Sequence, residues 1–351
     1  PRSAHEQVLA QIWQDVLGVE QVGRQDNFFE LGGDSIISIQ VVSRARRAGL
    51  SLQPRDLFQQ QTLQALAAVV KEQAAPLAHQ GPVDGVQTLT PIQRWFFDEP
   101  IPQRAHWNQA VLLVPRETLE LPRLQAALQR LLKQHDALRL RFSQVDGQWS
   151  ARYVGADSAD VVDMLWTARV ASEASLESVC DEAQRSLSLQ DGPLLRVALI
   201  AQADGSQRLL LVIHHLAVDG VSWRVLLEDL QAAYQGQDLP PKTSSFQAWA
   251  DKLDTYARSE VATDEMDWWQ AQLSQANDSL PAANAQASQA GHLRQGVSIG
   301  LNREQTRQLL QQAPAIYRTQ VNDLLLTALA RTLSRWTGHE SALIQLEGHG
   351  R

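Results

Sequence analysis

The sequence predicts a small all-α domain followed by a larger domain in which strands and helices alternate. Apolar residues recur at helical spacing through the first 72 or so residues, and from residue 89 the pattern changes to alternating strands and helices. The stretch between them is rich in Ala, Pro and Gly and has no period, which predicts a linker. We therefore expect a four-helix domain over residues 1–73, a linker over 74–88 and an α/β or α+β domain around a mixed sheet over 89–351.

Composition limits the classes of function. At 351 residues the chain is long enough for two or three domains, and its net charge of −8 argues against nucleic-acid binding. Cys180 is the single cysteine, which excludes a disulfide framework and a cysteine-based metal site and fits a reducing cytosol. No apolar run reaches membrane-spanning length and no secretory pattern is present. Because the chain starts at Pro1 and stops abruptly, we expect it to be part of something longer.

The first domain is predicted helix by helix. Apolar residues from Val8 to Leu17 share one helical face, and Gly18 is a plausible stop. A second helix is expected from Ser35 to Ala48, closed by Gly49. Pro54 begins a short helical turn, and apolar positions from Leu63 to Val70 mark the last helix.

The second domain is predicted in the same way. Pro91 suits the first turn of a helix, and the leucines at 124, 128, 131 and 132 give a strongly periodic one. Helices are expected near residues 90–96, 121–134, 176–187, 221–234, 246–257, 264–273, 304–312 and 321–336. Strands are expected near 110–114, 138–143, 151–154, 194–200, 209–214, 297–301 and 343–346.

Ser35 is the first candidate site. It lies at the first turn of its helix, after two glycines that leave the backbone open to an approaching partner. Free backbone N–H groups and the positive end of the helix dipole would favour a phosphate ester there. The alternative is an ordinary helix-capping serine.

The residues around Ser35 favour the phosphate ester. The string Asp26-x-Phe28-Phe29-x-Leu31-Gly32-Gly33-Asp34-Ser35-Ile36 resembles the peptidyl carrier domain of non-ribosomal peptide synthetases, over the whole first unit. The resemblance implies that Ser35, with Asp34 beside it, is where a phosphopantetheinyl transferase attaches 4′-phosphopantetheine. The thiol of that arm holds an aminoacyl or peptidyl thioester, and an upstream adenylation domain selects the residue.

Three arginines lie together at the far end of the Ser35 helix, at positions 44, 46 and 47. They are either a solvated helix face or a docking patch for another domain.

The linker that follows the first domain would let that domain swing relative to the second, because a flexible tether of about 12 residues spans roughly 20 Å.

The second candidate site is a histidine pair. The run 209–213 is apolar at every position, as in a strand covered on both faces, and it leads into His214 and His215. Side chains alternate along a strand, so the two histidines face opposite sides. Two hydrogen-bonded core histidines are one interpretation; a metal site is disfavoured because no further ligand set has matching spacing. In the other interpretation His215, backed by Asp219, is a general base, because imidazole ordinarily titrates near neutral pH.

The wider string resembles a known family. His214-His215-Leu216-Ala217-Val218-Asp219-Gly220 resembles the HHxxxDG motif of the condensation-domain superfamily, which has a two-lobed chloramphenicol-acetyltransferase-like fold. Ser222-Trp223 after it, Gly-Gly-Asp-Ser-Ile in the carrier, and Glu347-Gly348-His349-Gly350-Arg351 resemble the epimerization branch. The segments 91–96 and 322–325 resemble the opening motif and a late helix of the family. Members continue well past the last motif, so the second lobe is expected to be incomplete in this chain.

The resemblance assigns roles to residues. A thioester acidifies the Cα proton, and inversion at Cα is simplest with two groups flanking the carbon; the resemblance points to His215 and Glu347. The alternative for Glu347 is a salt bridge, for example with Arg351. Asp219 is expected to fix the turn, and His214, Ser222 and Trp223 to support the site by packing.

Three functions remain open. The first is epimerization of a carrier-bound L-aminoacyl or L-peptidyl thioester in the cytosol, before a downstream condensation domain uses it. The second is a condensation domain that joins two carrier-bound substrates. The third is an inactive docking platform for the carrier. The amino acid carried is not encoded in these residues.

Overall fold

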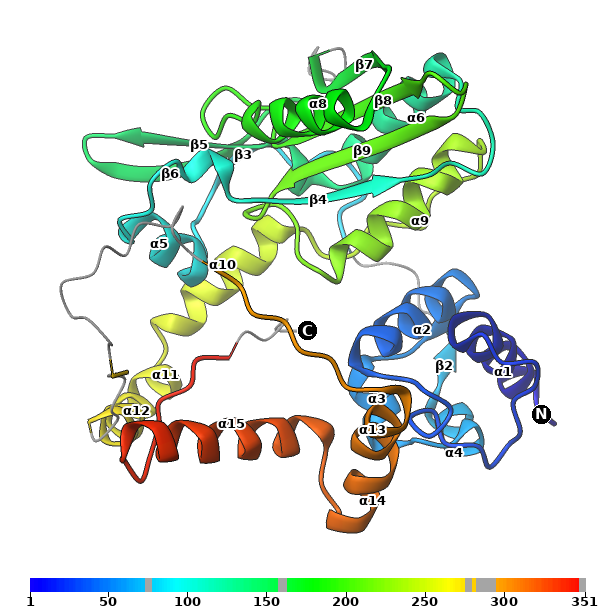
Figure 1. Ribbon diagram of the computed structural model, residues 1–351, viewed down its shortest axis with the longest axis vertical. Coiled ribbons are helices and arrows are strands. Elements are labelled where there is room, and N and C mark those ends of the chain that lie inside the picture. Colours follow the sequence, from blue (N-terminus) through cyan, green and yellow to red (C-terminus); the bar gives the residue numbers. More distant parts are fainter. Residues whose placement is uncertain (73–77, 157–162, 275–279, 282–294, 347–351) are drawn as a thin grey trace. The chain divides into compact units, whose positions relative to one another are not determined.

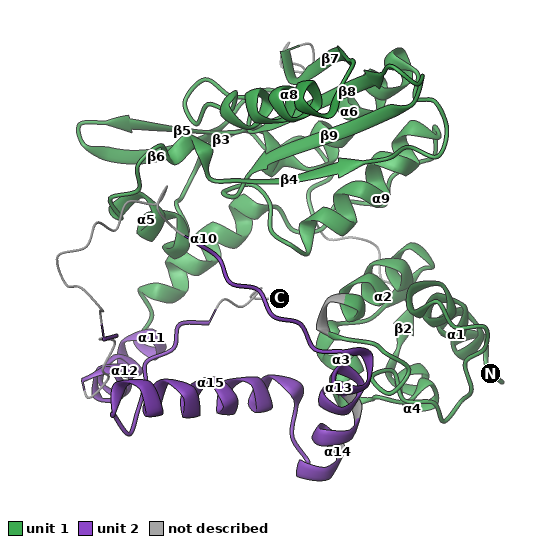
Figure 2. Cartoon of the chain, viewed as in Figure 1, with its two compact units in different colours: residues 1–259, 351 green, residues 260–350 purple. Residues whose placement is uncertain are grey.

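The computed structural model describes residues 1–72, 78–156, 163–274, 280–281 and 295–346. Residues 1–259 form one compact unit, and the residues from Glu260 onward form a second (Figure 2). Within the first unit we distinguish a helical domain, residues 1–72, from a sheet domain, residues 83–257. No helix in the described part of the chain combines the length and apolar character needed to cross a bilayer.

The helical domain contains the four predicted helices (Figure 1). They are α1 (Ala4–Leu17), α2 (Ser35–Arg47), α3 (Pro54–Gln59) and α4 (Leu63–Val69). Ser3 caps the start of α1, and Gly18 ends it in the left-handed conformation, as predicted. The ring centroids of Trp13 and Phe28 lie 5.0 Å apart in the core, and both side chains are fully buried. A two-residue ribbon that the sequence pattern did not predict pairs β1 (Leu50–Ser51) with β2 (Lys71–Glu72).

The sheet domain is built on a four-stranded mixed sheet in the order β4-β9-β8-β7. Its strands are β4 (Asn108–Leu113), β7 (Leu165–Val170), β8 (Leu195–Gln202) and β9 (Gln207–His214), and only the β7–β8 pair is parallel. The inner strand β9 is apolar at every position from Leu209 to Ile213 because both faces are covered. Its odd-numbered residues pack against α6 (Leu121–Gln134) and α9 (Ser222–Tyr234), and its even-numbered residues pack against α8 (Glu173–Arg185) (Figure 1).

A second, antiparallel sheet has the order β3-β6-β5. It consists of β3 (Gly85–Gln87), β5 (Leu140–Val145) and β6 (Gln148–Tyr153), and its core includes residues of α5 (Pro91–Asp98). Phe246, at the start of α10 (Phe246–Ala257), packs against this core. The predicted linker therefore extended too far, because β3 pairs with β6 and Val83 is buried.

The described residues of the second unit contain helices and no strand. These are α11 (Glu260–Asp264), α12 (Met266–Leu273), α13 (Arg303–Arg307), a π-helical turn (Gln308–Gln312), α14 (Ala313–Tyr317) and α15 (Val321–Thr337). The predicted strands at 297–301 and 343–346 are wrong: both segments are extended without pairing, and the side chain of Ile299 is 96% exposed. A strand needs a neighbour for its backbone hydrogen bonds, and no described residue of this unit provides one.

Candidate functional site

The histidine pair lies where β9 ends. Register pairs Asn108 with His214 and Gln109 with Ile213, and the His215 N–H donates to the Trp107 carbonyl at 2.8 Å. In an antiparallel pair, diagonal neighbours lie on the same face, so Gln109 and His215 share one side of the sheet. His214 has the parity of the residues that pack against α8, and His215 has the parity of those that pack against α6 and α9.

His214 is a fully buried, neutral imidazole. Its Nδ1 accepts the Leu216 backbone N–H at 3.1 Å, so the ring proton is on Nε2, which donates to the Arg104 carbonyl at 2.7 Å. The pKa of His214 is lowered from 6.5 to about 4, chiefly by burial; the bond to Arg104 opposes the shift and the neighbouring His215 adds to it. Both nitrogens are used in holding the loop, which leaves no free base at this position.

His215 is partly exposed and has the opposite tautomer. Its Nδ1 lies 2.8 Å from the Val218 carbonyl oxygen, which can only accept, so Nδ1 carries the proton in the neutral ring. Nε2 therefore presents a lone pair, and the Gln109 side-chain nitrogen lies 3.2 Å from it. The Trp223 indole N–H donates to the Gln109 oxygen at 2.8 Å. The arrangement leaves His215 with a basic nitrogen on a partly open face.

Asp219 organises the turn between the histidines and α9. Its Oδ1 accepts the Ser222 backbone N–H at 2.7 Å and the Ser222 hydroxyl at 2.6 Å. The sequence interpretation placed Asp219 behind His215, whereas the acceptor at His215 Nδ1 is the backbone carbonyl of Val218. Trp223 is buried in the core against α6 and the sheet and also holds Gln109. Glu347 lies outside the described residues.

The start of α2 fits a phosphopantetheine attachment site. Asp34 Oδ1 accepts the Ile37 N–H at 2.7 Å, so Asp34 caps the helix and no cap is required from Ser35. Gly32 has φ +101°, which favours glycine, and a Cβ at Gly33 would overlap the Phe28 ring. The two glycines thus hold a tight turn over the core. Ser35 follows as the first residue of a 13-residue helix, at the end where the helix dipole favours a phosphodiester.

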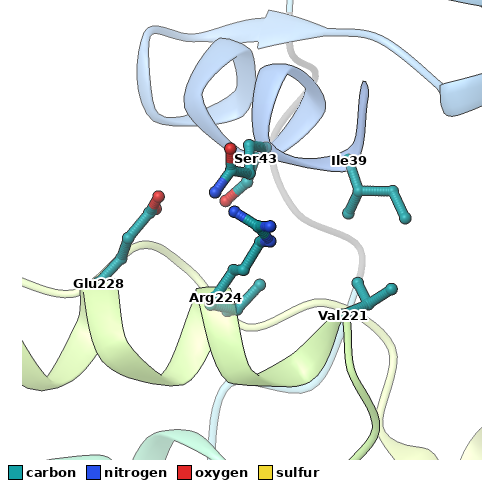
Figure 3. Close-up of a pocket in the computed structure, with 7 residues that line it drawn as sticks. Ile39, Ser43, Val221, Arg224 and Glu228 are labelled. Atoms are coloured by element: carbon teal, nitrogen blue, oxygen red, sulfur yellow. The ribbon is translucent and has the colours of Figure 1, made fainter. Parts of the chain in front are cut away.

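Helix α2 also contacts α9, within the first compact unit. Arg47 pairs with Asp229 at 2.7 Å and with Glu228 at 3.4 Å, and Arg44 lies 3.7 Å from Glu228. Asp229 is 1% exposed and holds His135 Nε2 at 2.8 Å with its other oxygen. A small pocket lies between the helices (Figure 3), lined by Ile39, Gln40, Ser43, Val221, Arg224, Val225 and Glu228. Arg44 and Arg47 are thus paired with a second domain rather than solvated on their own helix.

Helices α2 and α9 run in the same direction along this contact. Ile39 lies beside Val221 near the start of both helices (Figure 3). Arg47 pairs with Asp229 further along both helices. The helix end that begins at Ser35 therefore corresponds to the end of α9 that follows the histidine loop.

Sequence reasoning missed Gln109, Asp229 and His135. Gln109 follows Asn108 at the polar start of β4, and Asp229 occupies a buried position on an amphipathic helix. A polar residue on a buried helical position is the one signal that could have marked Asp229. Nothing local marks Gln109 as a neighbour of His215, because 106 positions separate them.

Comparisons with known proteins give the family. The model of the condensation domain matches residues 83–351, and the model of the phosphopantetheine attachment site matches residues 7–70. A linear gramicidin synthase protein of Brevibacillus parabrevis is 46% identical over 363 residues, covering 100% of this chain and 5% of that protein. Surfactin synthase subunit 1 of Bacillus subtilis (strain 168) is 41% identical over 361 residues, covering 100% and 10%. The chain therefore spans a tenth or less of the length of these relatives.

Among solved structures, the epimerization domain from the third module of tyrocidine synthetase B is similar to this chain with a TM-score of 0.69. It is 36% identical, and the match covers 75% of this chain and 62% of that one. A condensation domain from Monacolin K polyketide synthase, at 15% identity and a TM-score of 0.58, shares the fold. The chain thus belongs to the condensation-domain family: it joins a carrier domain for covalent 4′-phosphopantetheine to a two-lobed α/β domain of the type found in non-ribosomal peptide synthetases.

Proposed function

We propose that the chain epimerizes, at Cα, an aminoacyl or peptidyl thioester carried on Ser35, with His215 as one of two acid–base groups. The observation that carries the proposal is the hydrogen bond between His215 Nδ1 and the Val218 carbonyl oxygen, which in the neutral ring leaves the lone pair on Nε2. The similarity to the epimerization domain of tyrocidine synthetase B supports the choice within the family.

In the proposed reaction, one residue removes the proton from one face of Cα and another returns a proton to the opposite face. His215 Nε2 accepts the Cα proton, the Cα–H electron pair remains on the substrate, and the charged ring keeps its Nδ1–H bond to Val218. A group on the opposite face returns a proton to give the other configuration, and we assign this role to Glu347 on the resemblance of 347–351 to the epimerization motif. The phosphopantetheine thiol, when attached, supplies the thioester linkage. The contact of α2 with α9 supports delivery, because the end of α2 that begins with Ser35 corresponds to the end of α9 that follows the histidine loop.

The proposed partners follow from the resemblance. A phosphopantetheinyl transferase modifies Ser35, an upstream adenylation domain selects the residue, and a downstream condensation domain uses the product. A cytosolic location remains a prediction.

Solvent exchange tests the proposal. The full-length holo protein, loaded with a single amino acid and placed in D₂O, is expected to incorporate deuterium at Cα and to release a mixture of L and D acids. Replacing His215→Ala or Glu347→Gln is expected to slow incorporation by about 10²-fold or more, the usual contribution of a positioned acid or base. His339→Ala changes an exposed histidine of the second unit and is expected to exchange at the wild-type rate.

Other outcomes would assign another function. The matching family model is that of a condensation domain, so amide formation between two loaded carriers without Cα exchange would establish condensation. Neither exchange nor amide from the loaded protein would favour a docking platform and overturn the proposal.

A further inference from the structure

Three side chains form a directed hydrogen-bond chain that ends on His215. The Trp223 indole N–H donates to Gln109 Oε1 at 2.8 Å, Gln109 Nε2 lies 3.2 Å from His215 Nε2, and His215 Nδ1 donates to the Val218 carbonyl at 2.8 Å. The members come from α9, β4 and the loop after β9. None of the sequence motifs contains Gln109.

Each link of this chain fixes the next. An indole N–H can only donate, so the Gln109 oxygen must face Trp223, which turns the Gln109 NH₂ group toward His215. A backbone carbonyl can only accept, so the Val218 oxygen holds the ring proton on Nδ1. The contact with Gln109 and the contact with Val218 therefore both require His215 Nε2 to be an acceptor. Donor and acceptor roles agree only when the ring is neutral with its lone pair on Nε2.

A charged His215 would break this agreement. Its Nε2–H would meet the NH₂ group of Gln109, two donors facing each other. An amide flip would relieve that conflict and create a second one, because the NH₂ group would then face the Trp223 N–H. The pair therefore favours the neutral ring and opposes a resting imidazolium.

We propose that Gln109, anchored by Trp223, is a positioning residue that keeps His215 in the neutral tautomer with the Nε2 lone pair available to the substrate. The proposal rests on the proposed role of His215. In the reaction the Cα–H bond breaks, an N–H bond forms at Nε2, and the hydrogen bond from Gln109 to Nε2 is the one that gives way. The resulting donor–donor contact favours transfer of that proton from Nε2 to solvent water, so the ring returns to its starting form.

Few titratable groups adjoin His215 in the described part of the chain. On its own loop these are His214, whose two nitrogens are both bonded in the neutral form, and Asp219, which accepts from Ser222. The neighbouring positions Asn108 and Gln109 of β4 do not titrate, and neither does Trp223 of α9. The Gln109 amide is thus the described group that contacts the basic nitrogen directly.

The direct test is the tautomer itself. Nitrogen-15 NMR of the full-length protein labelled at histidine, with His215→Ala for assignment, is expected to show the Nδ1–H tautomer of His215 at pH 7. Free imidazole side chains favour the other tautomer, so a wild-type protein with the Nε2–H form or the imidazolium would overturn the proposal. This readout does not depend on catalysis, so it still decides if Cα exchange is absent.

Two substitutions test the chain of bonds. Gln109→Glu keeps an acceptor for Trp223 and places a carboxylate at His215 Nε2, so the spectrum is expected to change to the imidazolium at pH 7. Gln109→Met removes both bonds at similar size and is expected to give a mixture of tautomers. Gln148→Glu makes the same change of charge on exposed β6 and is the matched control. Unchanged His215 signals in both Gln109 variants would refute the positioning role.

The pH profile of Cα exchange separates positioning from mere stability. The acid limb of the profile is the pH range in which the exchange rate falls as the pH is lowered. In Gln109→Glu this limb is expected to move upward by about one pH unit, because an imidazolium–carboxylate bond replaces a donor–donor contact. Trp223→Phe frees the Gln109 amide to flip and is expected to move the limb in the same direction. If both variants exchange more slowly but the pH at which their rate falls is unchanged, these residues only support the fold. Absence of exchange in wild type would instead count against the proposed function.

Discussion

At the residue scale, His214 and His215 are adjacent in the chain but differ in burial and in the ring nitrogen that carries the proton. His214 is fully buried, bonded at both nitrogens and depressed in pKa to about 4, chiefly by burial. His215 is partly exposed, and its ring proton lies on the other nitrogen. The alternation of strand side chains sends them to opposite faces, and the backbone groups on each face choose the tautomer.

The low pKa of His214 predicts a pH-dependent stability. Because the folded pKa of about 4 is below the ordinary value of 6.5, the unfolded chain binds the proton more readily, and stability is full above pH 6.5. It is expected to fall as the pH drops from 6.5 toward 4, by about 3 kcal/mol in total from this group. Urea unfolding of wild type and His214→Gln between pH 7 and pH 4.5 measures the difference. His339→Gln should retain the wild-type slope, and an equal slope in His214→Gln would contradict the assignment.

At the element scale, the turn before α2 is determined by packing below it. Gly32 takes a φ of +101°, and Gly33 lies against the Phe28 ring, which itself packs on Trp13. Asp34 then caps the helix through the Ile37 N–H, and Ser35 follows as its first residue. The position of Ser35 thus depends on a core aromatic residue, which explains why a Gly-Gly pair precedes it.

Adding one methyl group to this turn is expected to destabilise the carrier. In Gly33→Ala the new Cβ would overlap Phe28, and overpacking of this kind costs about 1–3 kcal/mol. Urea unfolding of the full-length protein, followed by a signal from the helical domain, measures the loss. Gly155→Ala is the matched control, because a Cβ there meets no atom within 4 Å. Equal unfolding midpoints for the two variants would show that Phe28 can move aside.

At the scale of the whole molecule, residues 1–259 join a carrier to a sheet domain through complementary charge. Arg47 reaches the buried carboxylate of Asp229, and the second oxygen of that carboxylate holds His135 of the sheet domain. Asp229 would therefore keep His135 as a partner if the carrier undocked, so no buried charge would be left unpaired.

Reversing the charge of Arg47 is expected to weaken this contact. In Arg47→Glu the Cα exchange of the tethered thioester should fall about fivefold, equivalent to about 1 kcal/mol for a partly exposed pair. Arg55→Glu makes the same change on α3, away from the contact with α9, and should leave the rate unchanged. Adding Glu228→Arg to Arg47→Glu is expected to restore part of the rate, because Glu228 also pairs with Arg47. Equal rates in the Arg47→Glu and Arg55→Glu variants would show that the ion pairs do not contribute to delivery.

The sequence predicted most elements of the first compact unit because their signals are local. Helices α6 and α10 have the predicted bounds, and β9 was recognisable as a strand covered on both faces. β3 and β7 were missed: the three residues of β3 carry little pattern, and the alternation of apolar and polar residues in β7 was not recognised. The strands predicted at 297–301 and 343–346 are the opposite error. Their apolar runs do not form strands, because a strand needs a neighbour to pair with.

By itself, the sequence determined the two domains, the Asp34-Ser35 helix start and the histidine pair at a strand end, because short-range periodicity and turn chemistry encode all three. Only the tertiary structure decided which nitrogen of His215 carries the proton in the neutral ring and which residues contact the other one. Gln109 and His215 lie 106 positions apart, and the register of β4 on β9 brings them together. The partners of Asp229 likewise come from α2 and from the end of α6. Such contacts depend on how distant segments pack, a property that no local pattern along the chain specifies.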